Sequence, residues 1–320
     1  MKTLLNILNQ EIGYGRTKLN LDIAKLHTGT RLEVPVIIER SKKPGPTLLL
    51  IAGIHGNEVN GVEIVRQIIS AKYNKPTCGT VICIPVVNVF GFLNQKRQFP
   101  DGRDLNRVFP GSKKGSLASR FAYAIMQHIV PVVDYIIDYH TGGDSRFNYS
   151  QIRIDKNDNE CLELAKIFGS RFILHSKNRD KSFRKSATDL GKKVLLFEGG
   201  RSLYLDKMVT KSAIEGTLKV MHHLKIRDFE EEISTMPTEE NHHIITKSVW
   251  LRANRSGMYR KIPRLGQYVE KGQLIGTISD PYGNFEKPVK ATTNGFIICS
   301  NQASLVNQGD ALVHIGITED

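Results

Sequence analysis

The stretch IAGIHGNEVNG (51–61) places a histidine and a glutamate three positions apart, directly after an apolar run. A catalytic zinc site needs three protein ligands and one open position. A tight loop after a strand could bring His55 and Glu58 onto one ion, and Gly56 would let the backbone turn closely there. A plainer interpretation also fits: Glu58 could favour the first turn of a helix, where a carboxylate interacts well with the dipole, and His55 would then be a loop residue.

Two further polar residues close apolar runs and are followed by glycines. In DYHTGG (138–143) His140 ends one run, and in FEGG (197–200) Glu198 ends another. His140 could be a third metal ligand, because α/β sheets bind ligands at the carboxyl ends of their strands. A carboxylate near a metal but not bound to it can take the proton of a water and pass it to a leaving amine. Structural alternatives remain open, namely a hydrogen-bonded strand-end histidine and a glutamate in a salt bridge with a lysine.

A third cluster, RQFPDGRDLNRVFPG (97–111), is rich in arginine and turn residues. Arg97, Arg103 and Arg107 surround Asn106. Guanidinium groups bind carboxylates in a bidentate manner and stabilise a developing oxyanion. The alternative is an ordinary solvated loop.

The net charge of +13 is compatible with nucleic-acid binding, but the chain shows no signature of an RNA- or DNA-binding motif. The nearest basic cluster, KNRDKSFRKS (177–186), is interrupted by Asp180. Attraction of small anionic substrates explains the charge equally well. We therefore expect a small-molecule partner and no nucleic acid.

No apolar run approaches the roughly 18 residues of a membrane span, and the N-terminal residues lack the pattern of a signal peptide. The cysteines form no CxxC pair and are expected to be free thiols in a reducing cytoplasm. They are Cys78, Cys83, Cys161 and Cys299. The sequence thus predicts a cytoplasmic protein that does not bind a membrane.

Short apolar runs alternate with segments of helical periodicity up to about residue 225. Strands covered on both faces are expected at 47–54, 80–87, 133–139 and 193–198. Helices are expected at 58–73, 118–130 and 211–224. Their apolar faces would be Val62, Val65 and Ile69 in the first, Phe121, Ile125 and Ile129 in the second, and Ile214, Leu218, Met221 and Leu224 in the third. This alternation predicts an α/β sheet with helices on both faces.

The pattern changes after residue 225. Residues 226–243 are polar and acidic and indicate a linker, and short strand-like segments separated by glycine turns follow. We therefore expect a catalytic domain over residues 1–240 and a small all-β barrel or sandwich over residues 241–320. Tyr259 is expected to pack within this module rather than to face a pocket.

Taken in order, HGNE, an arginine upstream of DLNR, DYHTG and a strand-final glutamate resemble the succinylglutamate desuccinylase/aspartoacylase family, itself similar to the zinc carboxypeptidases. The resemblance covers most of residues 30–225 and implies a mixed, mostly parallel sheet. It implies the following roles: one Zn²⁺ bound by His55, Glu58 and His140; Glu198 as general base or acid; Asn106 and Arg107 as anchors of a substrate carboxylate; and Arg97 as the group that polarises the scissile carbonyl. Arg103 lies near enough in sequence to share in substrate binding or to replace Arg97. Asp138, two residues before His140, would face the same side of the strand.

The C-terminal module is similar to the β-domain of family deacylases and to biotinyl/lipoyl domains, but it lacks a convincing carrier lysine.

The resemblance implies a zinc-dependent amidohydrolase that removes an acyl group from an N-acyl amino acid or a related small molecule. A zinc carboxypeptidase acting on peptides and a binding protein with a degenerate site are the alternatives. The acyl group is not determined by the sequence, and neither is the oligomeric state, with a homo-oligomer possible. Two roles are open for the module: covering the site or mediating assembly.

Overall fold

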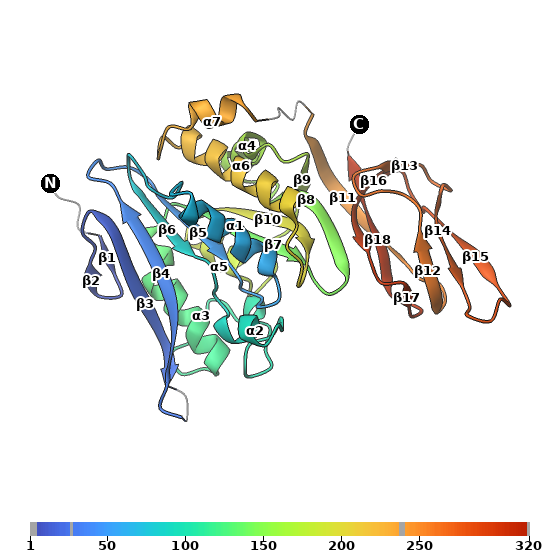
Figure 1. Ribbon diagram of the computed structural model, residues 1–320, viewed down its shortest axis with the longest axis horizontal. Coiled ribbons are helices and arrows are strands. Elements are labelled where there is room, and N and C mark those ends of the chain that lie inside the picture. Colours follow the sequence, from blue (N-terminus) through green and yellow to red (C-terminus); the bar gives the residue numbers. More distant parts are fainter. Residues whose placement is uncertain (1–4, 26–27, 237–240, 319–320) are drawn as a thin grey trace.

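The computed structural model describes residues 5–25, 28–236 and 241–318 (Figure 1). Its helices are α1 (Val59–Ser70), α2 (Val89–Leu93), α3 (Leu117–His128), α4 (Asn159–Phe168), α5 (Phe183–Asp189), α6 (Lys207–His223) and α7 (Glu230–Ser234), with 3-10 turns η1 (Leu105–Arg107) and η2 (Val130–Val132). Its strands are β1 (Asn6–Ile7), β2 (Gln10–Glu11), β3 (Gly15–Lys25), β4 (Arg31–Arg40), β5 (Thr47–Ala52), β6 (Thr80–Ile84), β7 (Tyr135–Gly142), β8 (Arg146–Ile154), β9 (Phe172–His175), β10 (Lys193–Arg201), β11 (His243–Arg252), β12 (Gly257–Lys261), β13 (Tyr268–Val269), β14 (Leu274–Ser279), β15 (Glu286–Lys290), β16 (Gly295–Asn301), β17 (Leu305–Val306) and β18 (Ala311–Thr318).

Among the described residues, twelve strands form one sheet in the order β13-β16-β18-β11-β9-β8-β10-β7-β5-β6-β4-β3. The central strands β10, β7, β5 and β6 run parallel to their neighbours in this group. Antiparallel pairs flank them, with β4 and β3 on one side and β8 on the other. The predicted α/β fold is therefore confirmed, and its sheet is mixed, with a parallel centre.

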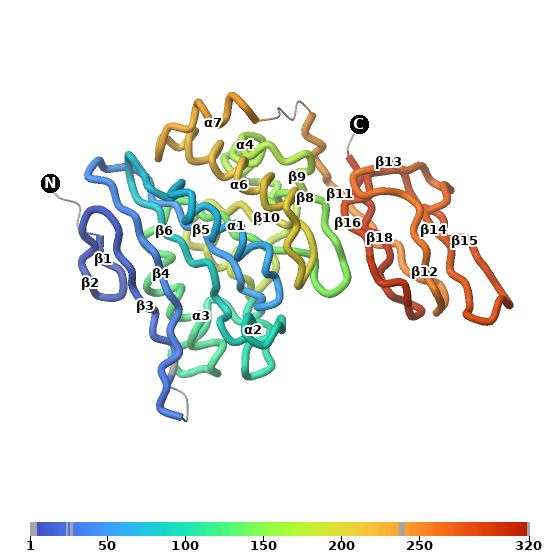
Figure 2. Tube along the Cα trace, viewed as in Figure 1, coloured from blue at the N-terminus to red at the C-terminus, as the bar shows by residue number. Residues whose placement is uncertain are grey.

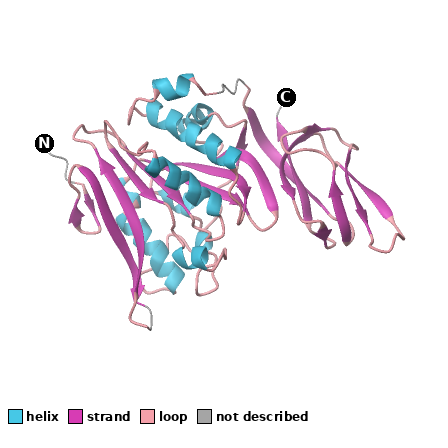
Figure 3. Cartoon of the chain, viewed as in Figure 1, coloured by secondary structure: helices cyan, strands magenta, loops and turns pink. Residues whose placement is uncertain are grey.

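Helices cover both faces of this sheet (Figure 3). Side chains of a strand alternate between faces, so a strand covered on both sides needs apolar residues at every position. In β5, Leu49 and Ile51 join the core that includes α3 and α5, whereas Leu48 and Leu50 join the core that includes α1, α4 and α6. The unbroken apolar run in the sequence is explained by these two cores.

The predicted apolar face is reproduced for α3, only in part for α6 and not for α1. In α6, Leu218 is buried but Ile214 is only partly buried. Phe121, Ile125 and Ile129 are fully buried. Val62 and Ile69 of α1 are only partly buried. The buried side of α1 consists of Asn60, Gly61, Ile64, Val65 and Ile68.

The face of α1 is shifted because Gly61 lies against the neighbouring strand. A Cβ atom at this position would lie 2.7 Å from the carbonyl oxygen of Tyr139. The absence of a side chain therefore allows α1 to pack closely on β7. A pattern of apolar letters does not reveal a contact made through a glycine.

The C-terminal strands continue the same sheet and also form a second layer. Strand β11 pairs with β9, and β16 pairs with β8. A separate sheet, β15-β14-β12-β17, shares a core with them, in which Ile278 and Val289 meet Ile297 and Ile315. The result is a two-layered β-module at the opposite end of the molecule from the N-terminal hairpin (Figure 2).

The described part of residues 226–243 is less irregular than a linker, because it includes α7, whose first turn holds three glutamates. Acidic side chains interact favourably with a helix N-terminus. Residue 240, where the domain boundary is expected, lies outside the described residues, and the division of the chain there stays a prediction. No helix within the described ranges is long and apolar enough to cross a membrane.

Candidate metal centre and active site

The loop after β5 is shaped by glycines. Gly53 has a φ of +67°, which side chains rarely allow. A Cβ atom on Gly56 would lie 1.9 Å from the backbone carbon of Gly91 in α2, so only glycine fits. This close approach buries His55 and Glu58, which are 3% and 2% exposed. Glu58 precedes α1 directly, but its side chain makes no capping hydrogen bond to the helix, which argues against the plainer interpretation of this residue.

The carboxylate of Glu58 is instead shared between two imidazoles. His55 Nδ1 lies 2.7 Å from Glu58 Oε1, and His140 Nδ1 lies 2.8 Å from Glu58 Oε2. The backbone N–H of Thr141 also donates to Oε2, at 3.0 Å. One ligand atom from each of the three residues lies within 4.8 Å of the others. The ends of β5 and β7 thus bring together the three predicted ligands.

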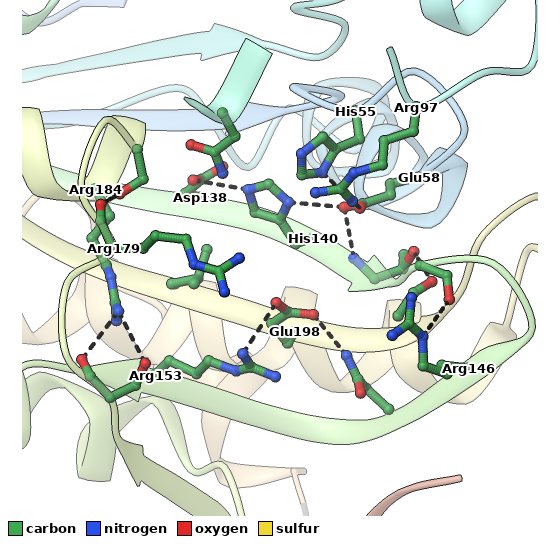
Figure 4. A pocket seen from close by; sticks show the side chains of 18 of the residues that line it. His55, Glu58, Arg97, Asp138, His140, Arg146, Arg153, Arg179, Arg184 and Glu198 are labelled. Carbon is green, nitrogen blue, oxygen red and sulfur yellow. Dashed lines mark hydrogen bonds and ion pairs between the residues drawn. The ribbon is translucent and has the colours of Figure 1, made fainter. Parts of the chain in front are cut away.

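Each imidazole has a carboxylate on its other side. His55 Nε2 lies 3.1 Å from Asp104 Oδ1, and His140 Nε2 lies 3.0 Å from Asp138 Oδ2 (Figure 4). Carboxylates placed in this way orient metal-binding histidines and increase their basicity. Two imidazole nitrogens and a carboxylate oxygen are also a ligand set that zinc accepts in catalytic sites. The residues present therefore fit a zinc ion.

The charges of the cluster favour a cation at its centre. Burial alone would raise the pKa of Glu58, but His55 and His140 lower this pKa well below its usual value. Burial lowers the pKa of His140, whereas Asp138 and Glu58 raise it, and the balance holds it well above its usual value. Both shifts mean that positive charge is stabilised among buried carboxylates.

Arg97 lies beside this cluster. Its guanidinium reaches Glu58 Oε1 at 3.2 Å and Asp104 Oδ2 at 2.9 Å. Asp104 also accepts from the backbone N–H of Asn106, which shapes the turn η1. Burial alone would raise the pKa of Asp104, but His55 and Arg97 lower it strongly. Arg97 is thus held at the edge of the His–Glu–His cluster by two carboxylates.

The remaining residues of the arginine-rich loop divide into two groups. Asn106 and Arg107 line the cavity, although the side-chain oxygen of Asn106 already accepts from the backbone N–H of Phe183. Arg103 lies outside the cavity: its side chain is 54% exposed and pairs with Asp101 at 3.2 Å. The geometry therefore does not support the prediction that Arg103 binds substrate.

Glu198 faces the cluster from the neighbouring strand β10. It is paired in register with His140 on β7. Its Oε2 accepts a hydrogen bond of 2.7 Å from Asn148 Nδ2, and Arg153 Nη1 lies 3.7 Å from its Oε1 (Figure 4). No lysine is among these contacts, so the expected alternative of a salt bridge to lysine does not describe this carboxylate.

These residues surround one cavity of about 640 Å³. Several residues that line it were not predicted to belong to a site: Asn148, Arg153, Lys177, Arg179, Ser182, Arg184, Trp250 and Cys299. Four of them come from the basic stretch 177–186, which charge alone singled out. The others come from β8 and from the C-terminal module, and no local signal marks them.

Arg184 and Trp250, which both line the cavity, show how its wall is built. Arg184 is buried, its Nη2 donates to the carbonyl oxygens of Ser176 and Lys177, and burial together with Arg153 lowers its pKa to about 10. Trp250 of β11 stacks on His314 of β18, with ring centroids 4.3 Å apart. The C-terminal module therefore supplies part of the cavity wall. Tyr259 packs in the module core, as predicted.

Fold and site together define an α/β protein with a buried His–Glu–His cluster at the strand ends of its sheet. A family model, the succinylglutamate desuccinylase/aspartoacylase catalytic domain, matches residues 44–224, more than half of the chain. The chain belongs to this family, which confirms the resemblance found in the sequence.

Several known proteins are similar to this chain. The N-alpha-acetyl-L-2,4-diaminobutyric acid deacetylase of Halomonas elongata is 27% identical over 299 residues, which cover 88% of this chain and 85% of that protein. The product-bound structure of the ectoine utilization protein EutE (DoeB) from Ruegeria pomeroyi has a TM-score of 0.84 at 21% identity, covering 99% of this chain and 100% of that one. The succinylglutamate desuccinylase/aspartoacylase structure from Rhodobacter sphaeroides has a TM-score of 0.83 at 22% identity, covering 96% and 97%. At these identities the two structures show a shared fold.

Proposed function

We propose that this chain is a zinc-dependent amidohydrolase that removes the acyl group from an N-acyl amino acid. The observation that carries the proposal is the position of Glu198 beside His140, because a carboxylate then lies next to three residues that could hold a metal ion. Membership of the deacylase family supports the reaction class. A zinc ion bound by His55, Glu58 and His140 would supply Lewis acidity and lower the pKa of water.

The side chains of this chain would then share the proton and charge transfers. Glu198 would accept the proton of the attacking water and return it to the departing amine, so that the amide C–N bond breaks with a neutral leaving group. Arg97 would stabilise the negative charge that develops on the carbonyl oxygen. Its hydrogen bond to Glu58 would keep the guanidinium close to the proposed metal ligands.

The cavity favours an anionic substrate. Among the residues that the structure describes, Arg107, Arg179 and Arg184 line the cavity without an ion pair to a carboxylate within 4.0 Å. A planar guanidinium is a bidentate partner for a carboxylate. We propose that Arg107, with Asn106 beside it, binds the α-carboxylate of the substrate. Burial lowers the pKa of Arg107, the nearby carboxylate of Asp104 raises it, and the positive charges of Arg179 and Arg97 lower it. The balance lies below the usual value, so Asp104 only partly offsets the burial of this guanidinium.

The four cysteines are free thiols. They fit a reducing compartment, which supports the proposal that the protein acts in the cytoplasm.

A substrate panel tests the proposed reaction. The zinc-loaded protein is assayed for amine release from N-acetyl and N-succinyl amino acids, from the same compounds with the carboxylate blocked as an amide, and from peptides of increasing length. We expect hydrolysis of free-carboxylate N-acyl amino acids and poor hydrolysis of the blocked compounds and long peptides. Preferred release of the C-terminal residue from peptides would favour a carboxypeptidase, and no hydrolysis by fully zinc-loaded protein would favour a binding protein.

A further inference from the structure

Glu198 lines the cavity beside His140, its partner on the neighbouring strand. Its two carboxylate oxygens have different neighbours: Asn148 Nδ2 donates to Oε2 at 2.7 Å, whereas Arg153 lies 3.7 Å from Oε1. Because Oε2 is engaged in the short hydrogen bond, Oε1 is the oxygen that remains to exchange a proton. Asn148 is itself only 4% exposed, so water does not compete freely for this contact.

Asn148 reaches Glu198 only because β8 is irregular. Strands β8 and β10 pair Leu196 with Arg153 and Glu198 with Gln151, but the next pair joins Gly200 to Asn148. Three residues of β8 therefore span two residues of β10. In a regular strand, positions 148 and 153 would project from opposite faces. The extra residue is a β-bulge, which turns Asn148 to the face of Glu198; bulges often re-aim a side chain next to an active site.

The bulged segment is held on its other edge by the C-terminal module. Strand β16 pairs antiparallel with β8, with Cys299 opposite Asn148 and Ser300 opposite Phe147. Asn148 thus lies between β10 of the catalytic sheet and β16 of the module. The short bulge has a defined geometry because both edges are paired.

We propose that Asn148 is a positioning residue that fixes the carboxylate of Glu198, and that β16 of the C-terminal module keeps Asn148 in place. The inference rests on the proposed role of Glu198 as the proton-transferring group. It assigns the module a part in catalysis through its strand pairing, in addition to the cavity wall that it supplies. A hydrogen bond from an amide to a carboxylate in a buried site is strong enough to select one orientation of the carboxylate.

Kinetics of two variants test the proposal. Asn148→Ala removes the donor, and Asn148→Asp keeps the shape but replaces the donor with a second carboxylate. We expect kcat to fall roughly tenfold or more in both, since a hydrogen bond to a charged group is lost, with KM and zinc content near wild type. The Asp variant should be the slower of the two because like charges then meet. Wild-type kcat in the Asp variant, or an effect confined to KM, would overturn the proposal.

Asn301→Ala is the matched control. Asn301 also lies on the junction, on β16 opposite Arg146, but its side chain donates to the carbonyl oxygen of Ala311 within the module. We expect this variant to keep wild-type kcat. A loss equal to that of Asn148→Ala would mean that the junction as a whole, and not the hydrogen bond to Glu198, determines the rate, which overturns the proposal.

A double-mutant cycle separates this inference from the proposed function. If Asn148 acts through Glu198, then adding Asn148→Ala to Glu198→Gln should change the residual rate by less than about twofold, because coupled residues are not additive. If Asn148→Ala lowered kcat by the same factor in the Glu198→Gln background as in the wild type, this result would contradict the positioning role of Asn148 but not the proposed function. Full activity of Glu198→Gln itself would instead contradict the proposed function, whatever Asn148 does.

Discussion

Glu198 and His140 occupy paired positions on the adjacent parallel strands β10 and β7. Each residue is close to the end of its strand, so the pairing places a carboxylate beside an imidazole at the edge of the sheet where ligands bind in α/β proteins. Asp138, two residues earlier on β7, supports the imidazole from the other side.

The metal ligands are tested by zinc content. Purified protein should contain about one zinc per chain, and His55→Ala or His140→Ala should lose most of it because two ligands cannot hold the ion tightly. The control is His223→Ala, since the side chain of His223 is 42% exposed on α6. Elemental analysis after dialysis measures the ratio of zinc to protein chain. Full zinc occupancy of both ligand variants would refute the assignment.

The carboxylate anchor is tested at Arg107. Lysine keeps the charge but not the planar fork, so Arg107→Lys should raise KM by about tenfold with zinc retained. Arg103→Lys is the matched control, because Arg103 is exposed and pairs with Asp101 outside the cavity. Steady-state kinetics of both variants decide the matter. Equal effects of the two substitutions would show that Arg107 is no specific anchor.

The loop after β5 is tested at Gly56. Gly56→Ala places a methyl group against the backbone of α2, so we expect a loss of at least about 2 kcal/mol in the free energy of unfolding, as for other overpacked sites, together with weaker zinc binding. Gly13→Ala is the control, because nothing lies within 4 Å of a Cβ atom there. Denaturant unfolding measures both. A stable Gly56→Ala protein with normal zinc content would contradict the close packing of this loop.

The pH dependence of stability is tested at His314. Burial, with a contribution from Arg153, lowers its pKa from 6.5 to about 3. Below about pH 6.5 the unfolded chain binds a proton that the folded protein does not, so stability falls as the pH decreases toward the folded-state value. At pH 5 this proton uptake by the unfolded chain lowers the free energy of unfolding by about 2 kcal/mol. His314→Gln should remove that part of the slope.

Unfolding curves of the wild type and of His314→Gln at about pH 7 and pH 5 provide the measurement. When the pH is lowered from about 7 to about 5, the free energy of unfolding should fall more in the wild type than in the variant. Parallel losses would show that His314 is not held neutral by its buried position against Trp250.

The sequence is informative where a residue ends a long apolar run. His55, His140 and Glu198 each follow such a run, and the parallel centre of the sheet necessarily brings those strand ends to one edge. Glu58 follows from its spacing to His55. These positions could be predicted because local pattern and global topology agree.

The rest of the site depends on contacts that leave no local trace. Asn148 reaches Glu198 through a one-residue bulge, which a period of two cannot predict. Trp250 enters the cavity wall because the C-terminal module pairs with β8 and β9. Arg179 and Arg184 belong to the basic stretch 177–186. Its charge is evident in the sequence, but the sequence does not show that it lies against the cavity. Long-range pairing, rather than residue type, determines all of these positions.

The most direct test of the central claim is the activity and zinc content of Glu198→Gln, measured on the same preparation. Gln keeps the size of the side chain and can still accept from Asn148, but it cannot take a proton from water. We expect about one zinc per chain and a fall in kcat of roughly 10²-fold or more, with KM little changed. A variant that lost its zinc would make Glu198 a ligand, and one that kept wild-type kcat with zinc bound would contradict its role in proton transfer.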